Sequence, residues 1–317
     1  MIGIEEIGSY VPVGRISNLD RLAEFGVGEE FVREKIGVPA VARKGQEEET
    51  SDLCVRAFAA LAQKAAVSPR ELDCLVVCTQ NPDGHGLPHT AAVVHGKLGC
   101  PDGVAAFDIS LGCSGYVYGL AVVTSFMCAH RLRRGLLFTA DPYSKIIDPC
   151  DKNTAMLFSD AAAVTLLGPD PLLRLRAARF ATRGADGDDL RCAGGRLEMN
   201  GRAIFNFSMT AVPPQIRALL AEEGLAMEEI DRFVLHQGSK YLLDTLGARL
   251  GLPAERVPTN LEEVGNTVSS SIPLLLERDL HDASCRRILI CGFGVGLSWA
   301  TAILERTPGT DGAHDAV

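Results

Sequence analysis

The sequence predicts an α/β protein in which a unit of about 150 residues occurs twice. Short β-rich runs alternate with longer helical patterns, and landmarks of the first half recur in the second at a nearly constant offset. Residues 97–99 match 249–251 at an offset of 152, and residues 133–138 match 286–291 at an offset of 153. Any two α/β units share the alternation, so the aligned landmarks are what favour duplication.

The first unit is predicted to hold a helix over 51–65 and a buried strand over 72–78, because the latter is a continuous apolar run. The second unit is predicted to hold the matching helix over 212–223 and strand over 230–236. The two strands are offset by 158 residues because the loop 80–88 is longer than its counterpart. The alternation predicts mostly parallel central sheets covered by helices.

A cluster of helix and strand breakers, 168–171, marks the boundary between the repeats. The sequence therefore predicts an N-terminal half over 1–168 and a C-terminal half over 169–307. The polar, glycine-containing segment 308–317 is expected to be a mobile tail.

Composition narrows the classes of function. Apolar residues make up 47% and charged residues 22% of the chain, as in soluble globular proteins. The net charge of -9 disfavours nucleic acid and anionic membranes as partners. No apolar run is long enough to span a membrane, and Met1–Glu6 lacks a basic signal region, so a cytoplasmic location is expected.

Metal binding is not expected. None of the ten cysteines has a C-x-x-C spacing, and most lie in apolar runs. His85, His89 and His95 have no carboxylate at ligand spacing, so they are expected to belong to a loop. The cysteine usage is typical of a reducing compartment.

The repeat brings three chemical groups together. The offset of 153 residues relates Cys113 to Asn266, and each is expected to follow a strand and open a helix. His236 ends the matching strand of the second unit. Because active sites of α/β proteins lie beyond the carboxyl ends of strands, the thiol, imidazole and amide are predicted to share one cleft.

Each of these residues also has a plainer interpretation. Cys113 in its Gly-Cys-Ser-Gly turn is expected at a helix N-terminus, which lowers a thiol pKa; otherwise it is a buried structural cysteine. An Nε2–H of His236 is suited to stabilise an oxyanion, although many histidines at strand ends are core residues. Asn266 is suited to the same anion, or to a helix N-cap.

The glycine-rich segment Gly292–Gly296 resembles a dinucleotide-binding loop only superficially. A strand over 297–304, and not a helix, is predicted to follow it, so the phosphate-cradling mechanism is lost. A turn that brings backbone N–H groups to a substrate carbonyl is the better interpretation.

As a set, the Cys113 turn, His236-Gln237, Gly265-Asn266-Thr267 and the glycine turn resemble the β-ketoacyl-acyl-carrier-protein synthase III enzymes of the thiolase superfamily. The resemblance covers about residues 1–305 and includes the motifs at 8–12, 148–151 and 158–161. It implies a duplicated, five-layered α-β-α-β-α fold.

The resemblance implies a mechanism as well. Cys113 would be acylated by a thioester, with the backbone N–H groups of Cys113 and Val295 as its oxyanion hole. His236 and Asn266 would hold the carbonyl of malonyl-acyl carrier protein and stabilise the enolate left by CO₂. The implied substrates are acyl-CoA or acyl-carrier-protein thioesters, with no cofactor and no metal, and the implied assembly is a homodimer.

The chain differs from the family at the residues that contact the adenine of CoA. Phe31 and Lys35 stand where the family has a Trp and an Arg against adenine, and Lys152 replaces a second Arg. Lysine lacks the planar guanidinium that stacks on a base, which makes an acyl-carrier-protein donor plausible, with looser CoA binding as the alternative.

Other residues follow from the same resemblance. The pantetheine channel is expected near Gly201 and Phe205, with Arg202 between them. Lys240, Arg249 and Arg256 are candidates for a carrier-protein patch or are simply solvated surface charges.

Leu87 precedes Pro88 in the loop that, in the family, crosses the dimer and limits the acyl pocket. Because Leu is smaller than the aromatic residue that the family often has at this position, the primer is predicted to be longer than acetyl, medium-chain or branched.

Two other functions stay open: an acyltransferase or secondary-metabolite ketosynthase that passes the acyl group to another nucleophile, and a catalytically silent subunit. The presence of all three catalytic residues argues against silence.

Overall fold

The computed structural model describes residues 2–308, so all but the first residue of the predicted tail lies outside the described part. Its strands are β1 (Gly3–Tyr10), β2 (Gly14–Ser17), β3 (Ala40–Arg43), β4 (Cys74–Cys78), β5 (Ala105–Ile109), β6 (Gly135–Ala140), β7 (Ala162–Gly168), β8 (Leu173–Thr182), β9 (Leu190–Ala193), β10 (Arg196–Met199), β11 (Arg232–Leu235), β12 (Arg287–Gly294) and β13 (Ser298–Arg306). Its α-helices are α1 (Leu22–Phe25), α2 (Thr50–Ala62), α3 (Thr90–Leu98), α4 (Gly115–His130), α5 (Lys152–Ala155), α6 (Gly201–Glu222), α7 (Lys240–Leu250), α8 (Leu261–Val264) and α9 (Ser271–Asp279).

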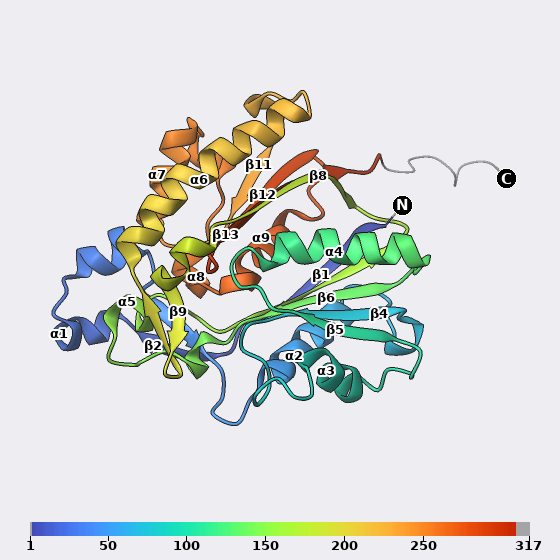
Figure 1. Ribbon diagram of the computed structural model, residues 1–317, viewed down its shortest axis with the longest axis horizontal. Coiled ribbons are helices and arrows are strands. Elements are labelled where there is room, and N and C mark those ends of the chain that lie inside the picture. The colour runs from blue at the N-terminus through green and yellow to red at the C-terminus, as the bar shows by residue number, and fades with distance from the viewer. Residues whose placement is uncertain (1, 309–317) are drawn as a thin grey trace.

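Nine of these strands form one sheet with the order β11-β12-β13-β8-β1-β7-β6-β4-β5 (Figure 1). The sheet consists of two halves, because β1 and β8 pair only through Ile4 and Leu173. One half contains β5, β4, β6, β7 and β1, and the other contains β8, β13, β12 and β11.

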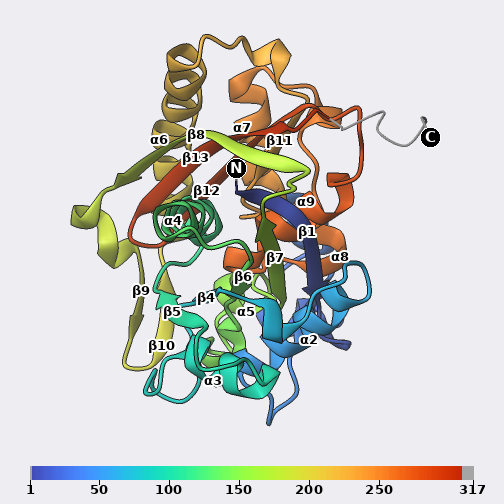
Figure 2. The same ribbon diagram turned by 90° about the vertical axis from the view of Figure 1, so that its right-hand side faces the viewer.

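Helices cover both halves of the sheet and fill the space between them. Helices α2 and α3 pack on the first half, and α6 packs on the second with α7 beside it. Helices α4 and α9 contact strands of both halves, and Figure 2 shows α4 end-on between the two groups of strands. The predicted five layers, α-β-α-β-α, are therefore confirmed.

The expected predominance of parallel strands is wrong. Only the pairs β4–β5, β4–β6 and β11–β12 are parallel, and the other neighbours in the sheet are antiparallel. The physical reason lies in the connections. Only a short segment joins β12 to β13, and a short connection between neighbours gives an antiparallel pair, whereas parallel neighbours need a long crossover.

The repeated connectors are structurally alike. The segments after α2 and α6 each form a single 3₁₀ turn, Pro69–Glu71 and Met227–Glu229, just before the buried strands β4 and β11. Strand β13 confirms the strand expected after the glycine turn. The predicted division of the chain at residue 168 coincides with the end of β7 and stays a prediction about domains.

Helix α6 differs most from its predicted range. The prediction placed the helix at 212–223, whereas it begins at Gly201, where the side chain of Asn200 accepts a hydrogen bond from Ala203 N at 3.2 Å. Pro213 and Pro214 lie inside the helix, where such residues normally argue against helix. The N-terminal half of α6 reaches the pocket described below.

None of the helices between residues 2 and 308 combines the length and apolar character needed to cross a bilayer. Over the same residues, no group of three or more His, Cys, Asp or Glu side chains is arranged to hold a metal ion.

Candidate active site

Cys113 lies between the end of β5 and the start of α4, as the sequence predicts. Small residues make the tight connection possible, because Gly115 N donates to the Gly112 carbonyl at 2.7 Å and a Cβ on Gly115 would collide with Cys78 Sγ. The thiol-bearing residue is buried, with 4% of its surface exposed.

The glycine turn between β12 and β13 packs directly against Cys113. A Cβ on Gly294 would lie 2.8 Å from Cys113 Sγ, and a Cβ on Gly292 would lie 2.5 Å from the Cys113 carbonyl oxygen. Only glycine permits this approach. The backbone N–H groups of Val295 and Cys113 both hydrogen-bond to the sulfur and lower the pKa of the thiol. The two amides named in the sequence analysis therefore face the sulfur.

Burial nevertheless dominates the titration of Cys113. Desolvation, together with the nearby carboxylate of Asp141, raises the pKa of this thiol to about 12. The expectation of a lowered pKa is wrong, because the two amide hydrogen bonds do not offset the loss of water around the sulfur. Cys113 is a neutral thiol at neutral pH and has to give up its proton during reaction.

His236 follows β11 directly and is 3% exposed. Its Nδ1 lies 2.8 Å from Ser271 Oγ, and its ring packs edge-on against Phe293, with centroids 5.5 Å apart. Burial lowers the pKa of His236 to about 3. The imidazole is therefore uncharged at neutral pH and is held in one orientation.

Asn266 does not follow a strand, contrary to the prediction. It comes after helix α8 and Gly265, and its backbone forms an isolated parallel bridge with Phe158. The amide group is oriented by two contacts: Oδ1 accepts from Val268 N at 3.0 Å, and Nδ2 donates to the Gly238 carbonyl at 3.4 Å. The remaining Nδ2 hydrogen is available to a ligand.

Three consecutive serines, 269–271, form hydrogen bonds between the segment after Asn266 and neighbouring residues. Ser269 Oγ donates to Asp141 Oδ2 at 2.6 Å, Ser270 Oγ lies 3.0 Å from Thr139 Oγ1, and Ser271 contacts His236. Asp141 also accepts from Gln80 N at 2.7 Å, and burial raises the pKa of its carboxyl to about 6. Residues of both repeats thus meet behind the pocket.

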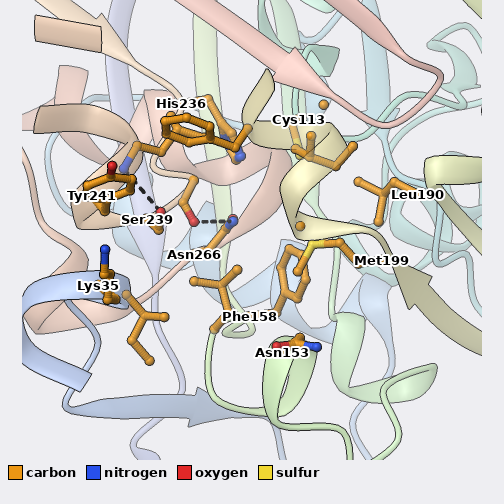
Figure 3. A pocket seen from close by; sticks show the side chains of 18 of the residues that line it. Lys35, Cys113, Asn153, Phe158, Leu190, Met199, His236, Ser239, Tyr241 and Asn266 are labelled. Carbon is orange, nitrogen blue, oxygen red and sulfur yellow. Dashed lines mark hydrogen bonds between the residues drawn. The ribbon is translucent and has the colours of Figure 1, made fainter. Parts of the chain in front are cut away.

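Cys113, His236 and Asn266 line one cavity of about 560 Å³ (Figure 3). This volume is within the usual range for small-molecule sites. The inner walls are mostly apolar and come from Leu157, Phe158, Leu190, Met199, Ile204 and Phe293. Of the residues expected to contact CoA or pantetheine, Phe31, Lys35, Gly201, Arg202 and Phe205 also line it.

Other predicted residues lie elsewhere. Lys152 and Lys240 are not in the lining, and Leu87 is 93% exposed. Lys240 Nζ is paired with Asp244 at 2.9 Å and with Glu34 at 3.4 Å. The guanidinium of Arg256 donates to the carbonyl of Ile230 and lies over Phe233, and its place in a carrier-protein patch stays a prediction.

Tyr241, which was not among the predicted site residues, also lines the cavity. Its ring stacks on Phe205 with centroids 5.4 Å apart, and Lys35 Nζ lies 3.9 Å from its centroid. The signal was present in the sequence, since Tyr241 is in the first turn of the helix that Ser239 caps, just after His236. Ser271 was not predicted either, because nothing in the sequence pairs it with His236 and only the structure shows their contact.

Comparison with known proteins agrees with this geometry. The family model for 3-oxoacyl-[acyl-carrier-protein] synthase III matches residues 107–184, and the model for the C-terminal part of that family matches residues 220–306. β-Ketoacyl-[acyl-carrier-protein] synthase III of Lactococcus lactis subsp. cremoris is 33% identical, over 95% of this chain and 98% of its own. The chain belongs to the 3-oxoacyl-[acyl-carrier-protein] synthase III family.

Solved structures of this family superpose closely on the chain. The synthase III of Thermus thermophilus has a TM-score of 0.88 at 31% identity, covering 97% of this chain and 100% of its own. The priming β-ketosynthase of the R1128 polyketide biosynthetic pathway has a TM-score of 0.87 at 26% identity, covering 98% and 97%. The solved structures that resemble this chain therefore include a polyketide enzyme.

The raised pKa of Cys113 predicts a characteristic pH dependence of alkylation. With a pKa of about 12, the thiolate fraction rises about tenfold for each pH unit through the neutral and mildly alkaline range. The iodoacetamide rate at Cys113, followed by peptide mass spectrometry, is expected to rise without levelling off near pH 9. His236, with its pKa of about 3, adds no inflection near neutrality. The same peptide in denatured protein is the reference and levels off above about pH 8.5; a plateau near neutral pH in the native protein would contradict the assignment.

Proposed function

We propose that this chain catalyses the decarboxylative Claisen condensation of an acyl thioester primer with malonyl-acyl carrier protein, through an acyl thioester on Cys113. One observation carries the proposal: a thiol, an imidazole and a carboxamide line a single cavity, and two backbone N–H groups face the sulfur. Membership of the synthase III family supports the same reaction.

In the first half-reaction, Cys113 Sγ attacks the acyl carbonyl and the carbon–sulfur bond of the donor thioester breaks. The N–H groups of Cys113 and Val295 stabilise the oxyanion that forms. The thiol proton leaves as the new bond forms and ends on the departing donor thiolate. Neutral His236 is suited to carry it, because burial lowers the pKa of the imidazole to about 3 and leaves one ring nitrogen unprotonated in the same cavity as the thiol.

In the second half-reaction, malonyl-acyl carrier protein occupies the cavity and loses CO₂. The electron pair of the broken carbon–carbon bond becomes an enolate, whose oxygen accepts hydrogen bonds from Asn266 Nδ2 and from Nε2–H of His236. The carbanion attacks the acyl carbon and the bond to Cys113 Sγ breaks with its electron pair on the sulfur. The thiolate then takes up one proton from solvent, which restores the neutral thiol. For Nε2–H to be the donor, Nδ1 has to accept from the Ser271 hydroxyl, so the single Ser271 hydrogen turns to the imidazole from the Val268 carbonyl, to which it donates at 3.0 Å in the structure.

The acyl donor is proposed to enter by its pantetheine arm, which CoA and carrier protein share. The aromatic pair Phe205 and Tyr241 gives the cavity entrance an apolar surface suited to that arm. The ion pairs of Lys240 with Glu34 and Asp244 leave less free positive charge for an acidic carrier protein. Both donors therefore belong in the test.

A second candidate is a ketosynthase that primes a secondary pathway. Two observations support this candidate. The chain is similar in structure to the R1128 priming β-ketosynthase, and Phe31 and Lys35 stand where the family has its adenine contacts. The site chemistry is unchanged; the primer and the carrier protein differ.

The active form is proposed to be a homodimer. Strand β5 is an edge of the sheet, and the adjoining surface exposes Leu87, Val122 and Phe180, while Phe107 and Phe126 pack edge-to-face at 5.4 Å beside it. An unpaired edge beside apolar side chains suits pairing with a second copy. Leu87 would then reach the partner's acyl pocket and admit primers longer than acetyl. Light scattering that gives a monomer mass at micromolar concentration would refute the dimer.

The function is tested by incubating the protein with acyl-CoA and acyl-carrier-protein thioesters of graded chain length. Intact-mass and peptide mass spectrometry are expected to find one acyl group, on Cys113, and addition of malonyl-acyl carrier protein is expected to remove it as the β-ketoacyl product. An acyl group on another cysteine, or none with any donor, would overturn the proposal. A strict preference for acetyl would overturn the expected primer length alone.

A further inference from the structure

We propose that the hydroxyl pair of Ser114 and Ser298 positions the Val295 amide against Cys113, and so controls the acyl-transfer half of the reaction. The inference rests on the proposed function for its kinetic consequence. It concerns two residues that do not touch the cavity: neither is in the described lining of the pocket. They are positioning residues, and their effect passes through the glycine turn.

The two hydroxyls form a short buried chain that ends on the turn. Ser114 Oγ and Ser298 Oγ are 2.6 Å apart, and Ser298 Oγ donates to the Val295 carbonyl at 2.9 Å. The two residues are only 1% and 2% exposed, so water does not replace these bonds. Because Ser298 uses its hydrogen on Val295, Ser114 is the donor to Ser298. Each hydroxyl hydrogen thus has one acceptor.

The turn needs such an anchor because its own backbone is permissive. Val295 stands between Gly294 and Gly296, with φ of 157° and 133°. Glycine has little steric restriction on φ, so the peptide planes on both sides of Val295 are free to rotate unless they are held. On the far side, Arg183 N donates to the Leu297 carbonyl at 2.8 Å. On the near side, Gly294 and Ser298 form the last pair of the β12–β13 ladder, and the Ser298 hydroxyl is the anchor of the Val295 carbonyl itself.

The anchored residue is the one that faces the sulfur. The N–H of Val295 hydrogen-bonds to Cys113, and the carbonyl of the same residue accepts from Ser298. Holding the carbonyl limits rotation about the Val295 backbone and therefore fixes the direction of its N–H. Ser114 adds a direct link, since it is the chain neighbour of Cys113. The nucleophile and its oxyanion donor are thus joined by side-chain hydrogen bonds as well as by packing.

The test measures the two half-reactions separately in three variants. Ser298→Ala is expected to slow acylation of Cys113 by about tenfold, a fraction of the 10²- to 10³-fold cost of deleting an oxyanion donor. Ser114→Ala is expected to act in the same direction with a smaller effect. Decarboxylation of malonyl-acyl carrier protein is expected to stay within about twofold of wild type, since His236 and Asn266 are untouched.

Ser298→Thr retains the hydroxyl and suits the first position of a strand, so it is expected to restore acylation. Ser284→Ala is the matched control, because Ser284 is exposed and its hydroxyl donates to Asp282 and not to the turn. Thermal unfolding of each variant separates a loss of folded protein from a loss of positioning.

A second readout needs no acyl substrate. The Val295 amide lowers the pKa of Cys113, so its misplacement in Ser298→Ala is expected to slow iodoacetamide alkylation at a fixed pH. If wild type alkylates faster than Ser298→Ala but accepts no acyl thioester, the proposed function fails while the positioning role stands. Wild-type rates of both acylation and alkylation in Ser298→Ala would overturn the positioning role. An equal fall of both half-reactions, or no restoration by threonine, would overturn it too.

Discussion

Replacing Cys113 with alanine is expected to abolish acylation and condensation while decarboxylation of malonyl-acyl carrier protein continues. The carbon–sulfur bond to the enzyme cannot form without the thiol, so condensation is expected to fall by about 10⁴-fold or more. His236 and Asn266, which hold the malonyl carbonyl in the proposed mechanism, keep their contacts with Ser271 and Val268 in this variant. Release of CO₂ and formation of β-ketoacyl product, measured in the same reaction, separate the two steps.

Cys128→Ala is the matched control, because Cys128 is an exposed thiol on α4, the helix that begins just after Cys113. It is expected to behave like wild type in both assays. Condensation that survives in Cys113→Ala would show that another group is the nucleophile. Loss of decarboxylation together with condensation, in a variant that unfolds at the wild-type temperature, would contradict the separation of roles.

Replacing Asn266 with alanine is expected to lower malonyl decarboxylation by about 10²- to 10³-fold, the usual cost of a lost oxyanion donor. Acylation of Cys113 is expected to continue, because it depends on the amides of Cys113 and Val295. Asn266→Asp is the sharper variant, since it keeps the shape and the acceptor for Val268 N but places an oxygen where Nδ2 faces the ligand. It is expected to be at least as impaired. Burst amplitude for acylation and the steady-state rate of CO₂ release measure the two effects.

Asn206→Ala serves as the control for this pair, because Asn206 is an exposed asparagine on α6 outside the described lining of the cavity. It is expected to leave both half-reactions unchanged. Normal decarboxylation in Asn266→Ala and Asn266→Asp would remove Asn266 from the enolate site, whatever happens at Cys113.

The sequence was sufficient to bring the three groups together. The offset between repeats related Cys113 to Asn266, and the end of a buried strand located His236; all three line one cavity. The prediction of a shared cavity was correct because the topology of the fold determines which chain segments meet at the carboxyl ends of strands. The local structure around Asn266 was still predicted wrongly, because a helix, α8, precedes it in place of a strand.

Properties that depend on the surroundings could not be obtained from local pattern. The position of Cys113 at the start of a helix favours thiolate, yet its pKa is raised, because its burial and its charged neighbours depend on residues distant in the sequence, such as Gly294 and Asp141. Arg256 is an ordinary surface cation by sequence, and only the structure gives it backbone carbonyl partners. The mixed direction of the strands likewise depends on connection lengths that breaker residues only partly indicate.

The run Ser269–Ser271 shows how the two repeats depend on each other. Its hydroxyls contact Asp141 and Thr139 of the first repeat and His236 of the second. The first repeat contains only the thiol of Cys113, and the second contains only the imidazole of His236 and the carboxamide of Asn266. Neither repeat could therefore complete a catalytic turnover by itself. Because one chain carries both repeats, the thiol, the imidazole and the carboxamide come together when the chain folds and need no encounter between separate chains.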